Sequence, residues 1–258
     1  MLANFSTVLS LTLSDVKAAG VTRLGGQDRY ETSVNIAKQF DKLINAIVIV
    51  NGEDYHDAIS SYVFAKRMGA AILLTESNTL SKSSLDFLNK SVSKDKNVYI
   101  IGNTKRVSSA VESIIKNQGF SNVERISGQS DYDTNSAVLD KMNVTEGTPV
   151  IFASGEGYAD GISISSIAVA KNAPILLVNN NNNKLQKQFV DSMKYLNVLV
   201  YGGIGSISDN LLGLLIDNSS SAMTAYSAVL QNGAIFFSTD DSKSESLNDN
   251  KYCNLNKH

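Results

Sequence analysis

The sequence contains one cysteine, Cys253, no tryptophan, and only two prolines and two histidines. One cysteine cannot form a disulfide within the chain, so packing must stabilise the fold without a covalent link. So few cysteines and histidines also argue against a zinc site built from these ligands. We therefore predict no bound metal and no cofactor. The low cysteine content suits either a cytosolic protein or one secreted by a Gram-positive cell.

The charge is nearly balanced, with 23 basic and 25 acidic side chains and a net charge of -2. This balance argues against a nucleic-acid-binding protein, which is usually strongly basic. A charged partner would therefore have to meet a local patch. No apolar run approaches the ~20 residues of a membrane span, so none is predicted. Residues 1–20 resemble the end of a secretory signal peptide without its basic start, and an ordinary N-terminal segment fits them equally well.

What the sequence does contain is an internal duplication. The segment RLGGQDRYETS at 23–33 returns as RISGQSDYDTN at 125–135, and GEDYHDAI at 52–59 returns as GEGYADGI at 155–162. The tripeptide Ile-Leu-Leu at 72–74 also returns, at 175–177. Segments that recur in order at nearly one spacing indicate a tandem repeat of about 100 residues. A unit of that size can bury its own core.

The repeat predicts the domain boundaries. We expect one module at residues 21–121 and a second at 122–217, preceded by the signal-peptide-like segment at 1–20. The repeat stops after Asp217, and residues 218–258 are rich in serine, asparagine and aspartate. This composition predicts a polar tail that is disordered or is a truncated third module.

Each unit alternates short apolar runs with amphipathic stretches. The runs are continuous and rich in β-branched residues, as is typical of strands buried on both faces of a parallel sheet. They lie at residues 46–50, 70–75 and 98–102 and at 149–153, 173–178 and 198–202. Short strand–helix units imply right-handed crossovers. The predicted fold class is α/β, with two tandem Rossmann-like or Toprim-like three-layer modules and mostly parallel sheets.

Several motifs were weighed as catalytic sites. Asp57 and Asp160 recur where helices should begin, so N-capping explains them better than a catalytic carboxylate pair. His56 has Ala159 as its repeat counterpart, which leaves no repeated base. The glycines at 202–205 lack the third glycine and the matched acid of a dinucleotide-binding loop. We predict no catalytic residues and no enzymatic activity.

Basic side chains near strand ends are the candidate contacts to a polyanion. Arg23 and Arg125 recur just before a turn, where an arginine could clamp a phosphate or carboxylate, or could form an ion pair that holds its strand. Both alternatives stay open on the sequence. The charge-based candidates are Arg23, Arg29, Lys105, Arg106 and Arg125.

Together the repeated segments resemble the cell-wall-binding repeat type 2 family of clostridial and related Gram-positive surface proteins, from Val21 to about Asp217. The resemblance implies secretion to the cell wall and non-covalent anchoring of a surface protein to an anionic polysaccharide or a teichoic-acid-like polymer. It also implies modules in sets of three with pseudo-threefold symmetry. Because only two complete modules are present, further modules or a homo-oligomer would complete the set. The anchoring motif carries over to Ile72, Leu73, Leu74, Ile175, Leu176 and Leu177.

The sequence leaves open two alternatives to a wall-anchoring function. A nucleotide- or sugar-dependent α/β enzyme would need a glycine loop with a matched acid, or a catalytic cluster in one unit alone. A two-lobed solute-binding protein would usually cross between its lobes more than once, whereas the tandem repeat has a single boundary near residues 119–122.

Overall fold

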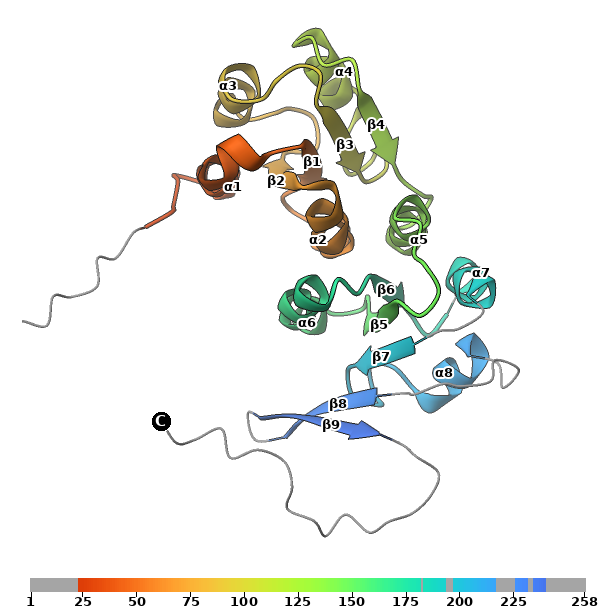
Figure 1. Ribbon diagram of the computed structural model, residues 1–258. Coiled ribbons are helices and arrows are strands. Elements are labelled where there is room, and N and C mark those ends of the chain that lie inside the picture. Colours follow the sequence, from red (N-terminus) through yellow and green to blue (C-terminus); the bar gives the residue numbers. More distant parts are fainter. Residues whose placement is uncertain (1–22, 182, 194–196, 217–225, 232–233, 240–258) are drawn as a thin grey trace, which may run out of the picture.

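The computed structural model describes residues 23–181, 183–193, 197–216, 226–231 and 234–239 (Figure 1). The signal-peptide-like segment predicted at residues 1–20 lies outside these ranges. The described chain forms two α/β modules, each built around its own sheet. None of its described helices is long and apolar enough to cross a membrane.

The first sheet has the strand order β2-β1-β3-β4, and all of its strand pairs are parallel. A helix connects each strand of this sheet to the next strand along the chain, and α1 and η1 precede the first strand. The elements are α1 (Arg29–Ala37), the 3₁₀ helix η1 (Lys38–Leu43), β1 (Ala46–Asn51), α2 (His56–Met68), β2 (Ala70–Thr75), α3 (Lys82–Lys90), β3 (Asn97–Ile101), α4 (Ser109–Asn117) and β4 (Val123–Ile126).

The second sheet repeats this order as β6-β5-β7-β8 and adds β9 antiparallel to β8. The fold class and the mostly parallel sheets predicted from the sequence are confirmed. The elements are α5 (Asp131–Lys141), β5 (Pro149–Ser154), α6 (Tyr158–Lys171), β6 (Ile175–Val178), α7 (Lys184–Ser192), β7 (Asn197–Tyr201), α8 (Asp209–Leu215), β8 (Tyr226–Gln231) and β9 (Ala234–Thr239).

The central strands form where the sequence offers unbroken apolar runs. All six residues of β1 are buried, as expected for a strand covered by helices on both faces. The helix after it ends at Gly69, whose φ of 58° lies in the left-handed region that glycine adopts without a steric penalty. Asn172 ends α6 in the same conformation, with φ 54°.

Strand pairing places the module boundary later than the repeat does. The predicted boundary between residues 121 and 122 assigns β4 to the second module, but β4 pairs with β3 in the first sheet. The helix that follows, α5, packs on β6 and α7 of the second module. The chain therefore passes from one sheet to the other after Ile126. The edge of β3 explains this arrangement, because its backbone groups need a partner.

Part of the tail predicted at residues 218–258 also belongs to a sheet. Residues 226–231 form β8 on the edge of β7, and residues 234–239 form β9 beside it. The second sheet thus takes its fourth strand from the segment predicted to be a polar, disordered tail or a truncated third module. The rest of that segment lies outside the described residues.

The two modules share one buried hydrophobic cluster, and the first module has a second cluster of its own. Helix α2 packs against α5 and α6 of the second module as well as against its own sheet, and it lies between the two modules in Figure 1. Ile59 and Val63 of α2 belong to the same buried cluster as Val138 and Leu139 of α5. We call this contact of α2 and its flanking loops with α5 and α6 the joint.

Candidate functional site

The joint lies at the place where an open α/β sheet usually binds its ligand. The chain runs outward from β1 to β2 and then returns to β3, so the loops after β1 and β3 diverge at their carboxyl ends. Such a switch point is the standard ligand crevice of doubly wound sheets. In the first module, the start of α5 from the second module approaches these loops.

Four ionisable side chains meet there, and we call them the joint cluster: Asp54, His56, Arg106 and Asp131. The guanidinium of Arg106 lies 3.0 Å from Asp54 Oδ2 and 2.7 Å from Asp131 Oδ2. Its Nε also donates to Asp131 Oδ1 at 3.2 Å. Arg106 therefore binds Asp131 with two hydrogen bonds and links a loop of the first module to a helix of the second.

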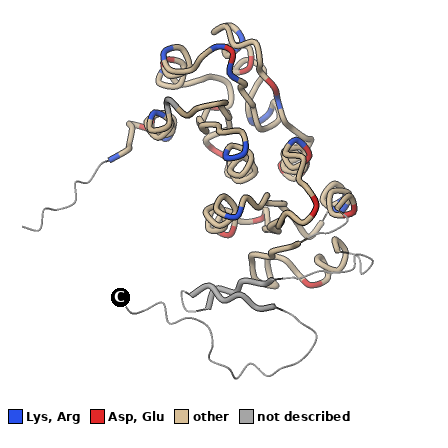
Figure 2. The backbone as a smooth tube through the Cα atoms, viewed as in Figure 1, with Lys and Arg blue, Asp and Glu red and all other residues tan. Residues whose placement is uncertain are grey.

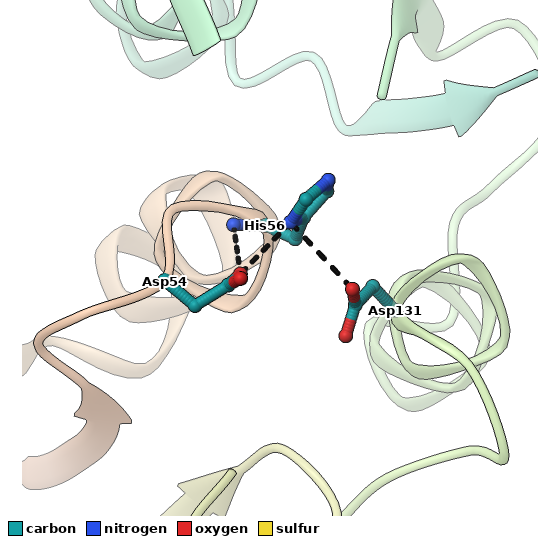
Figure 3. A group of neighbouring side chains, drawn as sticks. All are labelled: Asp54, His56 and Asp131. Carbon is teal, nitrogen blue, oxygen red and sulfur yellow. Dashed lines mark hydrogen bonds and ion pairs between the residues drawn. The ribbon is translucent and has the colours of Figure 1, made fainter. Parts of the chain in front are cut away.

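His56 lies between the two carboxylates (Figure 3). Its Nδ1 is 2.8 Å from Asp54 Oδ1 and 3.6 Å from Asp131 Oδ2. Its Nε2 is 2.8 Å from the carbonyl oxygen of Gly155, in the loop after β5. The ring stacks on Tyr55 at 4.0 Å between centroids, and the Tyr55 hydroxyl donates to the same carbonyl at 3.2 Å. One loop of the second module is thus held by two side chains of the first.

Asp57 is the buried acid beside this cluster. Its side chain is fully buried, and neither carboxylate oxygen has a hydrogen-bond partner. Burial, reinforced by the negative charges of Asp131 and Asp54, raises the pKa of Asp57 to about 7. The N-capping role predicted for Asp57 and Asp160 is wrong. Tyr55 and Gly157 hold the N-cap positions, without side-chain caps.

The joint cluster also contains the ligand types of a metal site. Single ligand atoms of Asp54, His56 and Asp131 lie within 4.8 Å of one another. However, Arg106 already binds both carboxylates, and both ring nitrogens of His56 face protein acceptors. An ion would have to displace these contacts. We therefore assign the cluster to holding the modules together.

A groove of about 360 Å³ opens beside the cluster and is lined by both modules. Lys105 in this groove is exposed. A second groove of about 440 Å³, between α5 and α7, is lined by Asp133 and Asp140 and by no basic residue. Of these two grooves, the joint groove is the better match for a polyanion. Its lining residues are Asn103, Lys105, Arg106, Gln129, Ser130, Asp131 and Tyr132.

The structure brings together only some of the predicted basic residues. Lys105 and Arg106 share the joint groove, whereas Arg23 and Arg29 are exposed at the start of the first module. Arg29 donates to the carbonyl of Gly52 at 2.5 Å. Figure 2 shows basic and acidic positions interspersed over both modules.

Arg125 has a structural partner set. Its Nε donates to Glu112 at 3.1 Å, and its Nη1 donates to the carbonyls of Gly102 and Val107 at 2.8 Å. Of the two alternatives for this arginine, the structure shows the ion pair that holds β4. The guanidinium also secures the loop that carries Arg106, so it supports the joint indirectly.

The six residues of the Ile-Leu-Leu motif lie in β2 and β6. Leu73, Leu176 and Leu177 are fully buried, while Ile72 and Leu74 are half-buried and pack against the joint core. The backbone N–H of Leu74 donates to Ser33 in α1, and that of Leu177 donates to Asn135 in α5. These strands therefore position the helix that starts each repeat. Anchoring by the motif stays a prediction.

Sequence reasoning missed the joint cluster itself. It found no repeat counterpart for His56 as a base and assigned no role to Asp131. The available signal was a pair of charge differences between the repeats: Asp131 replaces Arg29, while Arg106 has Ser206 as its counterpart. An acid present in only one repeat and a base present in only the other indicate contact. Only the fold shows that the loop after β3 meets the start of α5.

Comparisons with known proteins agree with both the repeat and the fold. The chain matches the family described as cell wall binding domain 2 (CWB2) at residues 23–112 and again at 125–212. It is similar to the N-acetylmuramoyl-L-alanine amidase LytC of Bacillus subtilis (strain 168), with 35% identity over 196 residues. It is also similar to the amidase enhancer of the same organism, with 35% identity over 158 residues.

Two solved structures share the arrangement. Cwp6 from Clostridium difficile covers 82% of this chain with a TM-score of 0.67 and 27% identity. Cwp8 from the same organism covers 79% with a TM-score of 0.69 and 25% identity.

The chain corresponds to only part of each relative. It spans 38% of the amidase and 21% of the amidase enhancer, while 76% and 61% of this chain are matched. It spans 36% of Cwp6 and 35% of Cwp8. The two family matches cover both repeats and most of the described residues. This chain therefore belongs to the cell wall binding domain 2 family.

Proposed function

We propose that this chain anchors a surface protein non-covalently to the Gram-positive cell wall by binding an anionic wall polymer, either a polysaccharide or a teichoic-acid-like chain. Membership of the wall-binding family carries this proposal. With this function goes the proposal that the protein is secreted and lies at the wall. The enzyme and solute-receptor alternatives gain no support from the relatives, since the family that matches both repeats is a binding domain.

The joint groove is our proposed polymer contact. Lys105 is exposed and forms no ion pair among the described residues. The amides of Asn103 and Gln129 line the same groove and can hydrogen-bond sugar hydroxyls or phosphate oxygens. One lysine binds weakly, but a repeating polymer can engage several such sites at once and gain avidity.

Charge reversal in the groove tests this contact. Lys105→Glu should weaken binding to purified wall polymer several-fold, and wild-type binding should fall as salt rises, because exposed charges are screened. Lys82→Glu is the matched control, since it makes the same charge change on the exposed start of α3, away from the groove. Equal loss in both variants, or binding that is insensitive to salt, would contradict a polyanion site in this groove.

We retain the Ile-Leu-Leu residues as anchoring residues, but acting through packing. Their side chains are largely buried in β2 and β6, and their strands fix α1 and α5. Helix α5 in turn carries Asp131 and follows the loop that lines the groove. On this proposal the Ile-Leu-Leu motif affects polymer binding by fixing the shape of the joint groove.

A further module, from another chain or another copy, would complete the set, and two exposed faces support this part of the proposal. Tyr158 and Ile162 of α6 are 62% and 48% exposed, whereas Ile59, the counterpart of Ile162, is 1% exposed in the joint. Ile36 of α1 is 46% exposed, whereas its counterpart Val138 is fully buried. Among the described residues, α1 and α6 thus each leave uncovered the face that the joint covers in the other repeat.

Light scattering across protein concentration tests this completion. The account predicts association that Ile36→Asp and Ile162→Asp each suppress, because each places a charge on an exposed apolar face. A monomer at every concentration, in the absence of any other module, would restrict the completion to modules from other chains.

A further inference from the structure

We propose that His56 is a proton-operated clamp of the joint: with both ring nitrogens protonated it links the two modules, and loss of one proton loosens them. This inference concerns the regulation of the proposed wall-binding site and rests on that function only for its biological use. The clamp itself is a property of the folded chain and can be measured without polymer.

The geometry around the ring requires two N–H donors. Nε2 faces the carbonyl oxygen of Gly155 at 2.8 Å, and a carbonyl can only accept. Nδ1 faces Asp54 Oδ1 at 2.8 Å. That carboxylate already accepts the backbone N–H of His56 through Oδ1 and meets Arg106 through Oδ2. A ring with one proton would satisfy one of these contacts and leave a nitrogen lone pair against an oxygen.

The surrounding charges favour the same state. The groups that face the ring are Asp54 from the loop after β1, Arg106 from the loop after β3, and Asp131 and Tyr132 from α5. Tyr55 stacks on the ring from the N-cap position of the same helix. With His56 charged, two cations balance Asp54 and Asp131. With His56 neutral, Arg106 alone faces these carboxylates, and Asp57 lies buried next to them.

Because His56 lies between the two modules, its protonation affects how they are held together. Gly155 belongs to the second module, so the Nε2 contact crosses the joint, and the Nδ1 side approaches Asp131 at the start of α5. Histidine is the side chain that ordinarily changes charge between about pH 5 and 8. Rising pH should therefore release the loop after β5 and the first turn of α5 together. The groove beside them, lined by Gln129 and Ser130, would change shape with them.

The second module has no such clamp of its own. The positions that correspond to Asp54, His56 and Arg106 are Gly157, Ala159 and Ser206. The proton dependence should therefore be confined to the joint, and amides elsewhere in the chain serve as internal references.

The test combines two measurements on the chain. Direct nitrogen NMR of the His56 ring, in buffer with EDTA to remove metal ions, reports its protonation, and amide hydrogen exchange reports opening of the joint. The chain has two histidines, and His258→Gln leaves only the His56 signal. We expect both ring nitrogens to carry protons at pH 6. As the ring loses one, protection of the Thr134 amide, which bonds to Ser130, should fall roughly ten-fold after correction for intrinsic exchange. The Leu85 amide, which bonds to Ser81 in α3, should not change.

Two variants separate His56 from its acidic neighbour. In Asp57→Asn the fall at Thr134 should remain, and in His56→Gln, which cannot titrate, it should disappear. A ring with one protonated nitrogen at pH 6 would overturn the clamp, and so would a fall that persists in His56→Gln but is lost in Asp57→Asn. Because no polymer is present, either failure leaves the wall-binding proposal to be judged by its own experiment.

Discussion

The joint and the exposed end of the second module use the same repeat positions with different chemistry. At the joint, α2 presents Ile59 to a packed core and its loops present Asp54, His56 and Arg106 to Asp131. At the exposed end, α6 presents Ile162 to solvent, and glycine, alanine and serine replace the three ionisable residues. The apolar part of the interface is retained in both places, while the charged part exists only where the modules meet. The ionic contacts are therefore specific to the joint.

The largest difference should appear when the shared isoleucine is truncated. Ile59→Ala removes a side chain that is 1% exposed and should cost about 2–5 kcal/mol of unfolding free energy. Ile162→Ala removes its 48% exposed counterpart and should cost well under half as much. Urea unfolding of both variants measures the contrast, and equal losses would show that the joint is not packed as described.

Exchanging the charged residue between the repeats should give a smaller effect. Arg106→Ser leaves Asp54 and Asp131 close together without their shared cation, and should destabilise the chain by about 1–3 kcal/mol. The reverse change at the exposed end, Ser206→Arg, should stay within about 0.5 kcal/mol. Thermal unfolding at low and at moderate salt would test this. A neutral Arg106→Ser would mean that the cluster contributes nothing to the joint.

The buried acid should give the chain a pH-dependent stability. The folded-state pKa of Asp57, about 7, lies above its ordinary value of 3.8, so the folded state holds its proton more tightly than the unfolded state. The Asp57 contribution to stability should therefore be complete below about pH 4 and be lost as pH rises through about 7. Asp57→Asn should flatten that slope in urea unfolding at pH 5 and pH 8. Asp160→Asn, at the half-exposed counterpart, is the control that should leave the slope in place.

The sequence predicted local structure and repetition well. The unbroken apolar run of β1 and the recurrence of whole segments led to the α/β class, the parallel sheets and the family. The sequence predicted the joint poorly. Arg106 and Asp131 are in contact only because α5 packs between the two sheets, and no local pattern indicates that packing. The capping role of Asp57 failed for a similar reason. Asp54, three residues earlier, accepts the first N–H of α2, and Asp57 turns into the interior instead.

The tail shows the same limit. The prediction was a polar tail that is disordered or is a truncated third module, yet β7 has an edge that a following strand can cover, as β4 covers β3. Whether such a segment forms a strand depends on the partner edge that the rest of the fold supplies. Composition alone does not contain that information.

The central claim, that this chain holds a protein on the wall through an anionic polymer, is tested most directly by co-sedimentation with purified cell walls. Intact walls should be compared with walls stripped of their anionic polymers, at low and at high salt. The account predicts that the chain sediments with intact walls at low salt, is released as salt rises, and stays in solution with stripped walls. Equal sedimentation with intact and stripped walls, or none with either, would contradict it.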